Sequence, residues 1–290
     1  MTQSQHMVQA NGLRFGTLVD GPPEGELVIL LHGFPEGAEM WLRQIGALRQ
    51  AGFLAVAPDL RGYGKTDAPE GVEHYAIGHL VDDVAALIKA FGRTEAHIAG
   101  SDWGALVAWY FASRHPEMTK TLTVLSVGHP ASLAAASAED EDQRERSRYV
   151  ALFLLEGKAE RVLAEENFGR LRAMFSRGPN PDAMPKSVVE AFIRSLSRPG
   201  RLTAALNYYR ANLSGDRAWA SLAPHEVNVS APTILLWGDQ DPALGRRSAE
   251  GTADFMEGDY RLVVLEGAGH WLQFERPDEV SRTMVEAITK

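Results

Sequence analysis

Cysteine is absent from this sequence of 290 residues. Its absence excludes a disulfide framework, a thiol nucleophile and a cysteine-based metal site. Basic residues are outnumbered, because 29 lysines and arginines stand against 38 aspartates and glutamates and leave a net charge of −9. Nonspecific nucleic-acid binding needs a basic surface, so we expect no nucleic-acid partner.

Long apolar runs are also missing. None approaches the ~20 residues that span a membrane, and the polar start at residues 1–6 lacks the charged and apolar regions of a signal peptide. The glycine-rich loop 60–66 lacks the spacing of a phosphate-binding loop, which excludes a nucleotide site of that kind. We therefore expect a soluble, cytoplasmic protein with no membrane partner.

The hydrophobic pattern predicts an α/β protein. Two alternating apolar segments within residues 7–19 flank Asn11-Gly12, a turn sequence typical of a β-hairpin. Further along, short runs that are apolar on both faces, as in buried parallel strands, alternate with runs of helical periodicity. The expected strands are 27–31, 53–57, 96–99, 122–125, 233–237 and 261–265, and the expected helices are 40–50, 79–91, 105–115, 246–256 and 277–289. This order predicts a doubly wound, mostly parallel sheet.

A long stretch interrupts this order. Residues 131–224 show no strand-like run, alanine and serine dominate 131–138, and the acidic run 139–142 is typical of an exposed helix start. The helical patterns cover 145–157, 158–174, 187–196 and 200–213. We predict a helical cap domain at 131–224, inserted into an α/β core domain made of residues 1–130 and 225–290.

Residues 100–104, Gly-Ser-Asp-Trp-Gly, join a predicted strand to a predicted helix. A reactive side chain on such a sharp turn needs small neighbours, because glycine has no Cβ to clash. The central residue is Asp102. Ser101 stands one position too early and Ser126 lacks flanking glycines, so a serine hydrolase is disfavoured. The alternative interpretation is that Asp102 only caps the following helix.

Ligands of an open α/β sheet bind beyond the carboxyl ends of its strands. Polar residues at the predicted strand ends are His32, Asp59, Asp102, Ser126, Asp239, Asp241 and His270. A turn role for Asp241 and a surface position for His270 are the ordinary alternatives. However, Asp102, Asp241 and His270 follow one another in the nucleophile, acid and histidine order of the α/β-hydrolases. This order favours a catalytic site.

Several motifs resemble one family. Residues 32–36, His-Gly-Phe-Pro-Glu, match its oxyanion loop, 59–64 its next loop, 100–104 its nucleophile turn and 269–271 its histidine segment. The chain therefore resembles, over nearly its whole length, the α/β-hydrolases with an inserted helical cap. Within them it resembles the epoxide hydrolases most, with haloalkane dehalogenases as near relatives. Ser101 departs from the family, which usually has histidine or glutamine there.

The resemblance implies a reaction in two steps. Asp102 opens an epoxide and forms a covalent ester, and water activated by His270 hydrolyses that ester to a vicinal diol. Asp241 orients His270, and the backbone N–H groups of Phe34 and Trp103 form the oxyanion hole. A carboxylate is ionised at pH 7 and needs no general base to attack a strained carbon. The implied reaction requires no metal and no organic cofactor.

Two tyrosines and an apolar pocket complete the implied site. Residues 207–210, Asn-Tyr-Tyr-Arg, resemble the segment that carries one epoxide-binding tyrosine and place it at Tyr209; Tyr149 resembles the other. The family often has Phe-Gln where this chain has Phe153-Leu154, and both tyrosines could be ordinary cap core. The expected pocket residues are Phe34, Pro35, Trp103 and Trp271. Apolar cap residues predict a hydrophobic pocket, but the sequence does not show which of them line it; examples are Leu152, Phe153, Phe168, Phe175 and Phe192.

Two other functions compete with this interpretation. A haloalkane dehalogenase would place asparagine at Phe34 to bind halide beside Trp103, and a fluoroacetate-type enzyme would place arginines where Trp103 and Leu106 stand. A non-catalytic ligand-binding member of the fold has no need of the complete acid–histidine set. We therefore expect a small hydrophobic epoxide and water as substrates, in a monomer or a homodimer.

Overall fold

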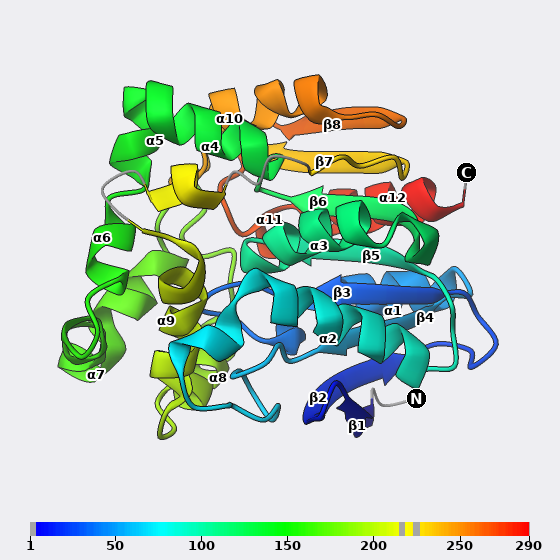
Figure 1. Ribbon diagram of the computed structural model, residues 1–290, viewed down its shortest axis with the longest axis horizontal. Helices are drawn as coiled ribbons and strands as arrows, with labels where there is room; N and C mark the ends of the chain where they lie inside the picture. The colour runs from blue at the N-terminus through cyan, green and yellow to red at the C-terminus, as the bar shows by residue number, and fades with distance from the viewer. Residues whose placement is uncertain (1–3, 215–217, 223–226, 290) are drawn as a thin grey trace.

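The computed structural model describes residues 4–214, 218–222 and 227–289. Within these ranges, one sheet of eight strands runs in the order β1-β2-β4-β3-β5-β6-β7-β8 through the centre of the molecule (Figure 1). The strands are β1 (Ser4–Ala10), β2 (Leu13–Asp20), β3 (Leu27–Leu31), β4 (Leu54–Pro58), β5 (Ala96–Ser101), β6 (Thr119–Leu125), β7 (Thr233–Gly238) and β8 (Tyr260–Leu265). β1 pairs with β2 and β2 with β4 antiparallel, and every other neighbouring pair is parallel.

The sequence pattern explains these strands. β3, β4 and β5 are buried at every position because helices cover both faces of the sheet, which is why they read as continuous apolar runs. The hairpin turns at Asn11 and Gly12, whose φ angles of 47° and 73° are both positive, as a two-residue turn of this hand requires. The predicted α/β fold with its doubly wound, mostly parallel sheet is confirmed.

Helices form layers on the two faces of the sheet. In Figure 1, α2 (Ile77–Ala90) and α3 (Trp103–Arg114) lie in front of the strands, whereas α1 (Leu42–Gln50) and α12 (Pro277–Ile288) lie behind and pack against each other. The short helices α10 (Arg246–Glu250) and α11 (Leu272–Glu275) complete this part of the molecule. No helix of the described ranges has the length and apolar character needed to cross a bilayer.

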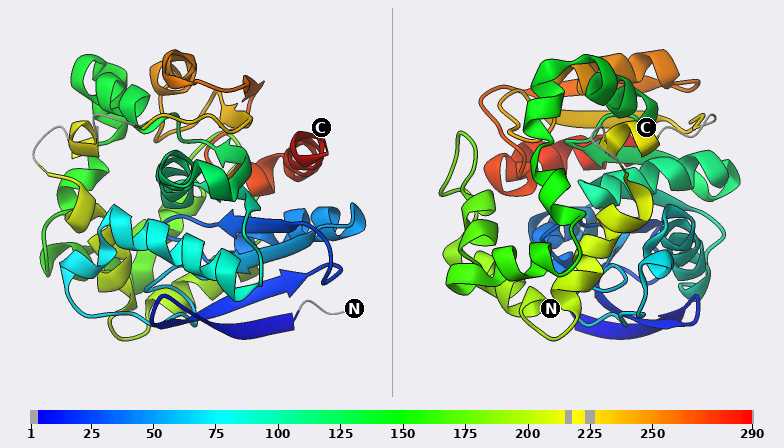
Figure 2. Two further views of the ribbon diagram at one scale, coloured as in Figure 1. Left: turned by 45° about the vertical axis from the view of Figure 1, so that its right-hand side comes forward. Right: turned by 60° about the vertical axis from the view of Figure 1, so that its left-hand side comes forward.

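The segment between β6 and β7 is helical wherever it is described. It contains α4 (Pro130–Glu139), α5 (Glu141–Arg146), α6 (Tyr149–Phe153), α7 (Lys158–Phe175), α8 (Lys186–Leu196) and α9 (Arg201–Asn212). Helices α5 to α9 lie beyond the carboxyl ends of the parallel strands, and the view that brings this end forward shows them crossing it (Figure 2, right). They therefore cover the edge at which ligands of such sheets bind.

The division into two domains stays a prediction. α4 packs against α10 and the short helix η5 (Gly251–Phe255), which both follow β7, so the first inserted helix contacts the core. The predicted boundary at residues 224 and 225 lies outside the described residues.

Three predicted helices differ from the structure, and one helix was not predicted. Residues 145–157 do not form one helix, because α5 ends at Arg146 and α6 starts at Tyr149. Residues 131–138 belong to α4, whose alanines and serines carry no amphipathic signal and whose first turn His129 caps. α7 is interrupted at 165–168, and the helix predicted at 246–256 divides into α10 and η5. In contrast, Asp140 caps α5 through the N–H of Asp142, as the acidic run predicts.

Candidate active site

Asp102 sits on a strained turn between β5 and α3. Its φ angle is 51° and its ψ angle is −121°, a conformation that few residues other than glycine adopt. A Cβ on Gly100 would lie 2.2 Å from the carbonyl oxygen of Gly104, and a Cβ on Gly33 would lie 2.3 Å from the Cβ of Asp102. Asp102 precedes α3, but its side chain makes no capping hydrogen bond. The turn instead presents the carboxylate to the covering helices.

The loop after β3 supplies one donor to this carboxylate. The backbone N–H of Phe34 donates to Asp102 Oδ1 at 2.8 Å. His32 fixes the loop: its Nε2 accepts from the N–H of Leu60 at 2.9 Å, so its Nδ1 carries the proton and donates to the carbonyl of Gly33 at 2.9 Å. Burial lowers the pKa of His32, which favours this neutral form.

Trp103 is the predicted second donor of the oxyanion hole. It is the first residue of α3, and the N–H groups of a first helical turn have no acceptor inside the helix. Its backbone N–H is therefore available beside Asp102, at the positive end of the helix dipole. Its indole ring packs against Tyr209 with ring centroids 5.1 Å apart. The role of this N–H in an oxyanion hole stays a prediction.

Asp241 serves both a turn and a histidine. Its Oδ1 accepts from the N–H groups of Ala243 and Leu244 at 2.7 and 3.0 Å, and its Oδ2 lies 2.8 Å from His270 Nδ1. His270 Nε2 lies 3.6 Å from Asp102 Oδ2. The structure thus brings the three predicted residues into one line, Asp241–His270–Asp102, and His270 is buried rather than on the surface.

Ser126 and Glu275 hold the backbone of the histidine loop. Ser126 Oγ donates to the carbonyl oxygen of His270 at 3.0 Å. The carboxylate of Glu275 accepts from the N–H groups of Gly269 and Trp271 at 2.7 and 3.0 Å. The sequence pattern did not indicate Glu275, because an acid at the end of a short helix is ordinary in itself.

His270 stands between two carboxylates. Burial opposes its charged form, but the charges and hydrogen bonds of Asp241 and Asp102 outweigh burial and raise the pKa of His270 well above its usual value. The two carboxylates therefore favour the imidazolium form of His270.

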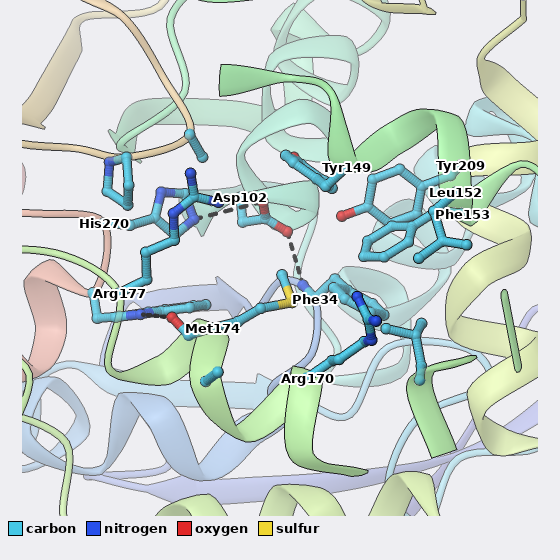
Figure 3. A pocket seen from close by; sticks show the side chains of 15 residues that line it. Phe34, Asp102, Tyr149, Leu152, Phe153, Arg170, Met174, Arg177, Tyr209 and His270 are labelled. Carbon is cyan, nitrogen blue, oxygen red and sulfur yellow. Dashed lines mark hydrogen bonds and ion pairs between the residues drawn. The ribbon is translucent and has the colours of Figure 1, made fainter. Parts of the chain in front are cut away.

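A cavity of about 320 Å³ opens in front of Asp102 (Figure 3). Its lining residues are Phe34, Asp102, Tyr149, Leu152, Phe153, Leu163, Arg170, Ala173, Met174, Arg177, Tyr209, Pro242, Ala243, His270 and Trp271. The predicted pocket residues Phe34, Trp271, Leu152 and Phe153 are among them. No group of three or more histidine, aspartate or glutamate side chains in the described part of the chain is placed to hold a metal ion.

Two predicted pocket residues, Pro35 and Trp103, and three of the apolar cap residues do not line this cavity. Pro35 lies inside a turn closed by the hydrogen bond from Glu36 N–H to Gly33 O at 3.1 Å, and Trp103 is covered by Tyr208, Tyr209 and Trp219. Phe175 and Phe192 pack on each other with ring centroids 5.8 Å apart, and Phe168 lies in the interruption of α7. These side chains pack against neighbouring residues instead of facing the cavity.

Tyr149 and Tyr209 line the same wall of the cavity from α6 and α9, with ring centroids 6.3 Å apart. Burial, together with the negative charge of Asp102, raises the pKa of both hydroxyls far above their usual value, so both keep their protons near pH 7. Tyr208 faces away, because its hydroxyl donates to the carbonyl of Arg61 at 2.8 Å. Of the two neighbouring tyrosines, Tyr209 is therefore the one that can reach a bound ligand.

Known proteins share this arrangement of elements. A family model for the α/β hydrolase fold matches residues 26–277. The chain belongs to the α/β-hydrolase fold family. It is 34% identical over 281 residues to an α/β-hydrolase superfamily protein of Bacillus subtilis, with 97% of this chain and 96% of the other covered. It is 32% identical over 319 residues to epoxide hydrolase A of Mycobacterium tuberculosis, with 99% and 97% covered.

A solved structure extends this similarity to three dimensions. The crystal structure of epoxide hydrolase A from Mycobacterium thermoresistibile matches with a TM-score of 0.85 at 32% identity, and covers 99% of this chain and 98% of the other. The resemblance to epoxide hydrolases predicted from the motifs is therefore confirmed.

Five residues of α7 and of the turn after it line the cavity of this α/β-hydrolase but were not predicted: Leu163, Arg170, Ala173, Met174 and Arg177. Arg170 and Met174 share one face of the helix because they are four positions apart, and Arg177 follows just beyond the helix end at Phe175. The sequence pattern of α7 did not indicate a cavity wall, because its charged residues are typical of an exposed face. Helical spacing could have grouped Arg170 with Met174, but only packing shows which face turns inward.

Glu36 is the last residue of the oxyanion-loop motif of this α/β-hydrolase, and the motif assigns no role to it. It is 2% exposed, and neither of its carboxylate oxygens has a hydrogen-bond partner among the described residues. Burial raises the pKa of Glu36 well above its ordinary 4.5, and the charge of Asp102 adds to this effect while His270 opposes it. Glu36 is therefore protonated at a pH where exposed glutamates are ionised.

Replacing Glu36 with glutamine is expected to change the pH dependence of stability. The folded protein binds the Glu36 proton more tightly than the unfolded chain does. The free energy of unfolding is therefore undiminished by Glu36 below pH 4.5 and declines as the pH rises toward the pKa of Glu36 in the folded protein. Glutamine does not ionise. Between pH 5 and pH 8, the Tm of the variant relative to the parent should rise by at least about 2 °C. Melting curves with the exposed Glu266→Gln as control measure this, and parallel pH profiles would contradict it.

Proposed function

We propose that this chain is an epoxide hydrolase in which Asp102 is the nucleophile, His270 the base, and Tyr149 and Tyr209 the acids. One observation carries the proposal: the Asp102 carboxylate and two protonated tyrosine hydroxyls face the same apolar cavity. An epoxide needs a nucleophile on its carbon and a proton donor on its oxygen, and this cavity offers both. The relatives named above as epoxide hydrolases support the same function.

The first step opens the ring. Phe34 holds Oδ1 of Asp102, so Oδ2 is free to attack an epoxide carbon. A new bond forms between Oδ2 and that carbon while the carbon–oxygen bond of the ring breaks. The ring oxygen leaves as an alkoxide and takes a proton from Tyr149 or Tyr209. Two donors aimed at one oxygen stabilise its charge as that charge develops.

The second step hydrolyses the ester. Once Asp102 is esterified, one of the two carboxylates that raise the pKa of His270 has lost its charge. His270 can then give up its proton, which replaces the proton lost by the tyrosine. Neutral His270 takes a proton from water, and the resulting hydroxide attacks the ester carbonyl. The oxyanion forms on Oδ1, which Phe34 already holds, and Trp103 N–H is available as a second donor. The oxyanion then collapses and breaks the bond between the carbonyl carbon and Oδ2. The departing alkoxide takes the proton of the newly formed carboxyl group, so the diol leaves behind the Asp102 carboxylate and the His270 imidazolium.

A dehalogenase fits the cavity less well. Halide release would use the indole N–H of Trp103, but the ring of Trp103 is packed between Tyr208, Tyr209 and Trp219 and does not line the cavity. The tyrosine hydroxyls suit an alkoxide, which accepts a proton. The mostly apolar lining suits a small hydrophobic epoxide, with water as the second substrate.

The proposal is tested by product analysis. A panel of aryl and alkyl epoxides is assayed for vicinal diol, and a matched panel of haloalkanes for free halide. We expect diol without halide release. Halide release without diol supports the dehalogenase, and ligand binding without turnover of any epoxide supports a non-catalytic member of the fold.

The tyrosines sharpen this test. Tyr149→Phe and Tyr209→Phe each remove one donor, and we expect each to lower kcat/KM for diol formation about 10²-fold, with a larger loss in the double variant. Tyr208→Phe is the matched control, since its hydroxyl binds the carbonyl of Arg61 outside the cavity. Single-turnover kinetics should place the loss in ring opening. Unchanged ring opening in the double variant would remove the tyrosines from the mechanism.

A further inference from the structure

Two arginines at the mouth of the cavity have no role in the reaction described above. We propose that they bind a carboxylate carried by the substrate, so that the preferred epoxide is a molecule with an apolar body and an acidic end. This inference rests on the proposed function and names the class of epoxide that the same site takes. The two residues are Arg170 and Arg177, and both line the cavity.

The two arginines lie on either side of Met174 in the sequence. Arg170 belongs to α7, whereas Arg177 follows the end of this helix at Phe175, in a turn closed by the hydrogen bond from its backbone N–H to the carbonyl of Met174 at 3.2 Å. Figure 3 shows Arg177 on the side of His270 and Arg170 on the side of Phe153. Their guanidinium groups therefore flank the cavity rather than forming a single clamp, and a chain leaving the cavity passes between them.

Neither guanidinium has an ion-pair partner in the described part of the chain. Arg172, between them in sequence, pairs with Glu190, and Arg210 on the neighbouring helix α9 pairs with Glu160 at 2.8 Å. Around the cavity, the only acidic lining residue in the described ranges is Asp102. In a chain of net charge −9, two unpaired cations on an apolar pocket form a local site for an anion.

The negative charge of Asp102 and the positive charges of the two arginines determine where a substrate carboxylate can bind. A carboxylate deep in the cavity would be repelled by Asp102, whose oxygen must approach the epoxide carbon. A carboxylate at the mouth avoids that repulsion and can receive two parallel N–H bonds from either guanidinium. Both arginines are exposed, so the ionic contact remains hydrated and the apolar lining holds the rest of the molecule. The arrangement thus orients the epoxide end toward Asp102 and the acidic end toward solvent.

The test compares an epoxide that has a terminal carboxylate on an alkyl chain with its methyl ester. At low ionic strength we expect the parent enzyme to favour the acid by about threefold to tenfold in kcat/KM, mainly through KM, and added salt should reduce the preference. In the Arg170→Gln/Arg177→Gln double variant, kcat/KM should fall more for the acid than for the ester, so that the preference is lost. Arg161→Gln, which removes an exposed arginine of α7 outside the lining, is the matched control and should keep the preference.

Each outcome decides one of the two proposals. Equal use of acid and ester by the parent, or a preference that survives in the double variant, overturns the carboxylate site while diol formation still supports the hydrolase. An equal loss on both substrates in the double variant also overturns it, because the arginines would then support the cavity in general. If the parent forms no diol from the acid, the ester or the wider epoxide panel, the proposed function itself fails.

Discussion

Replacement of His270 by glutamine is expected to stop the enzyme halfway, with the substrate bound covalently to Asp102. Ring opening needs the Asp102 carboxylate and the tyrosine hydroxyls, which the substitution leaves in place, whereas ester hydrolysis needs the base. We expect kcat to fall at least about 10³-fold. Glutamine is chosen because its amide can still donate to Asp241, which is fully buried and would otherwise keep a charge without a partner.

Intact-protein mass spectrometry measures this result. The variant incubated with an epoxide should gain the mass of one substrate molecule, and proteolytic digestion should locate the added mass on the peptide that contains Asp102. A His270→Gln/Asp102→Asn variant is the control and should gain no mass. Sustained turnover by the single variant, or an adduct on any other residue, would contradict the assigned roles.

Replacement of Asp102 by asparagine is expected to abolish both diol formation and the adduct. A neutral amide has no carboxylate oxygen to attack the epoxide carbon, and the N–H of Phe34 then faces a group without charge. Loss of a nucleophile removes the reaction path itself, so we expect a decrease of about 10⁴-fold or more in kcat. The loss should be complete in single-turnover experiments, where the His270 variant still reacts once.

Two further variants serve as controls for this prediction. Asp102→Ala shows whether any residual activity of the asparagine variant comes from hydrolysis of the new amide to aspartate, which mass spectrometry would detect as a gain of about 1 Da. Asp239→Asn is the matched control, because Asp239 lies at the end of β7 and only accepts the N–H of Gly267 at 2.7 Å, which an amide oxygen can also do. Normal activity in Asp102→Ala would assign the nucleophile to another residue.

Local chemistry explains why the nucleophile turn could be predicted from the sequence. The glycines at 100 and 104 are required because a Cβ would strike the backbone at about the same close distance on both sides, 2.2 Å in each case. Asp102, Asp241 and His270 each follow a predicted parallel strand. Because the carboxyl ends of parallel strands meet at one edge of the sheet, the three residues were expected to lie close together. Both arguments use only neighbouring residues or the order of the strands along the chain, and both can be read from a single sequence.

The cavity lining could not be predicted in the same way. Whether Phe175 faces the ligand depends on which face of an inserted helix packs inward, and whether Trp103 does depends on how α9 packs on the start of α3. The pattern of apolar residues does not distinguish core from cavity. The interruption of α7 at 165–168 and the helical state of 131–138 were hidden for a related reason. Small or charged side chains have weak periodicity, and tertiary contacts decide their conformation.

The location of the two cavity tyrosines has a consequence for how this enzyme could change its chemistry. Asp102, Asp241 and His270 follow strands of the sheet, whereas Tyr149 and Tyr209 lie on α6 and α9, which add no strand to it. The attacking group and the proton donors to the departing oxygen are thus encoded in separate parts of the chain. Exchange of the helices between β6 and β7 could therefore redirect the enzyme to a different leaving group, while the sheet keeps the same nucleophile and the same way of releasing its ester.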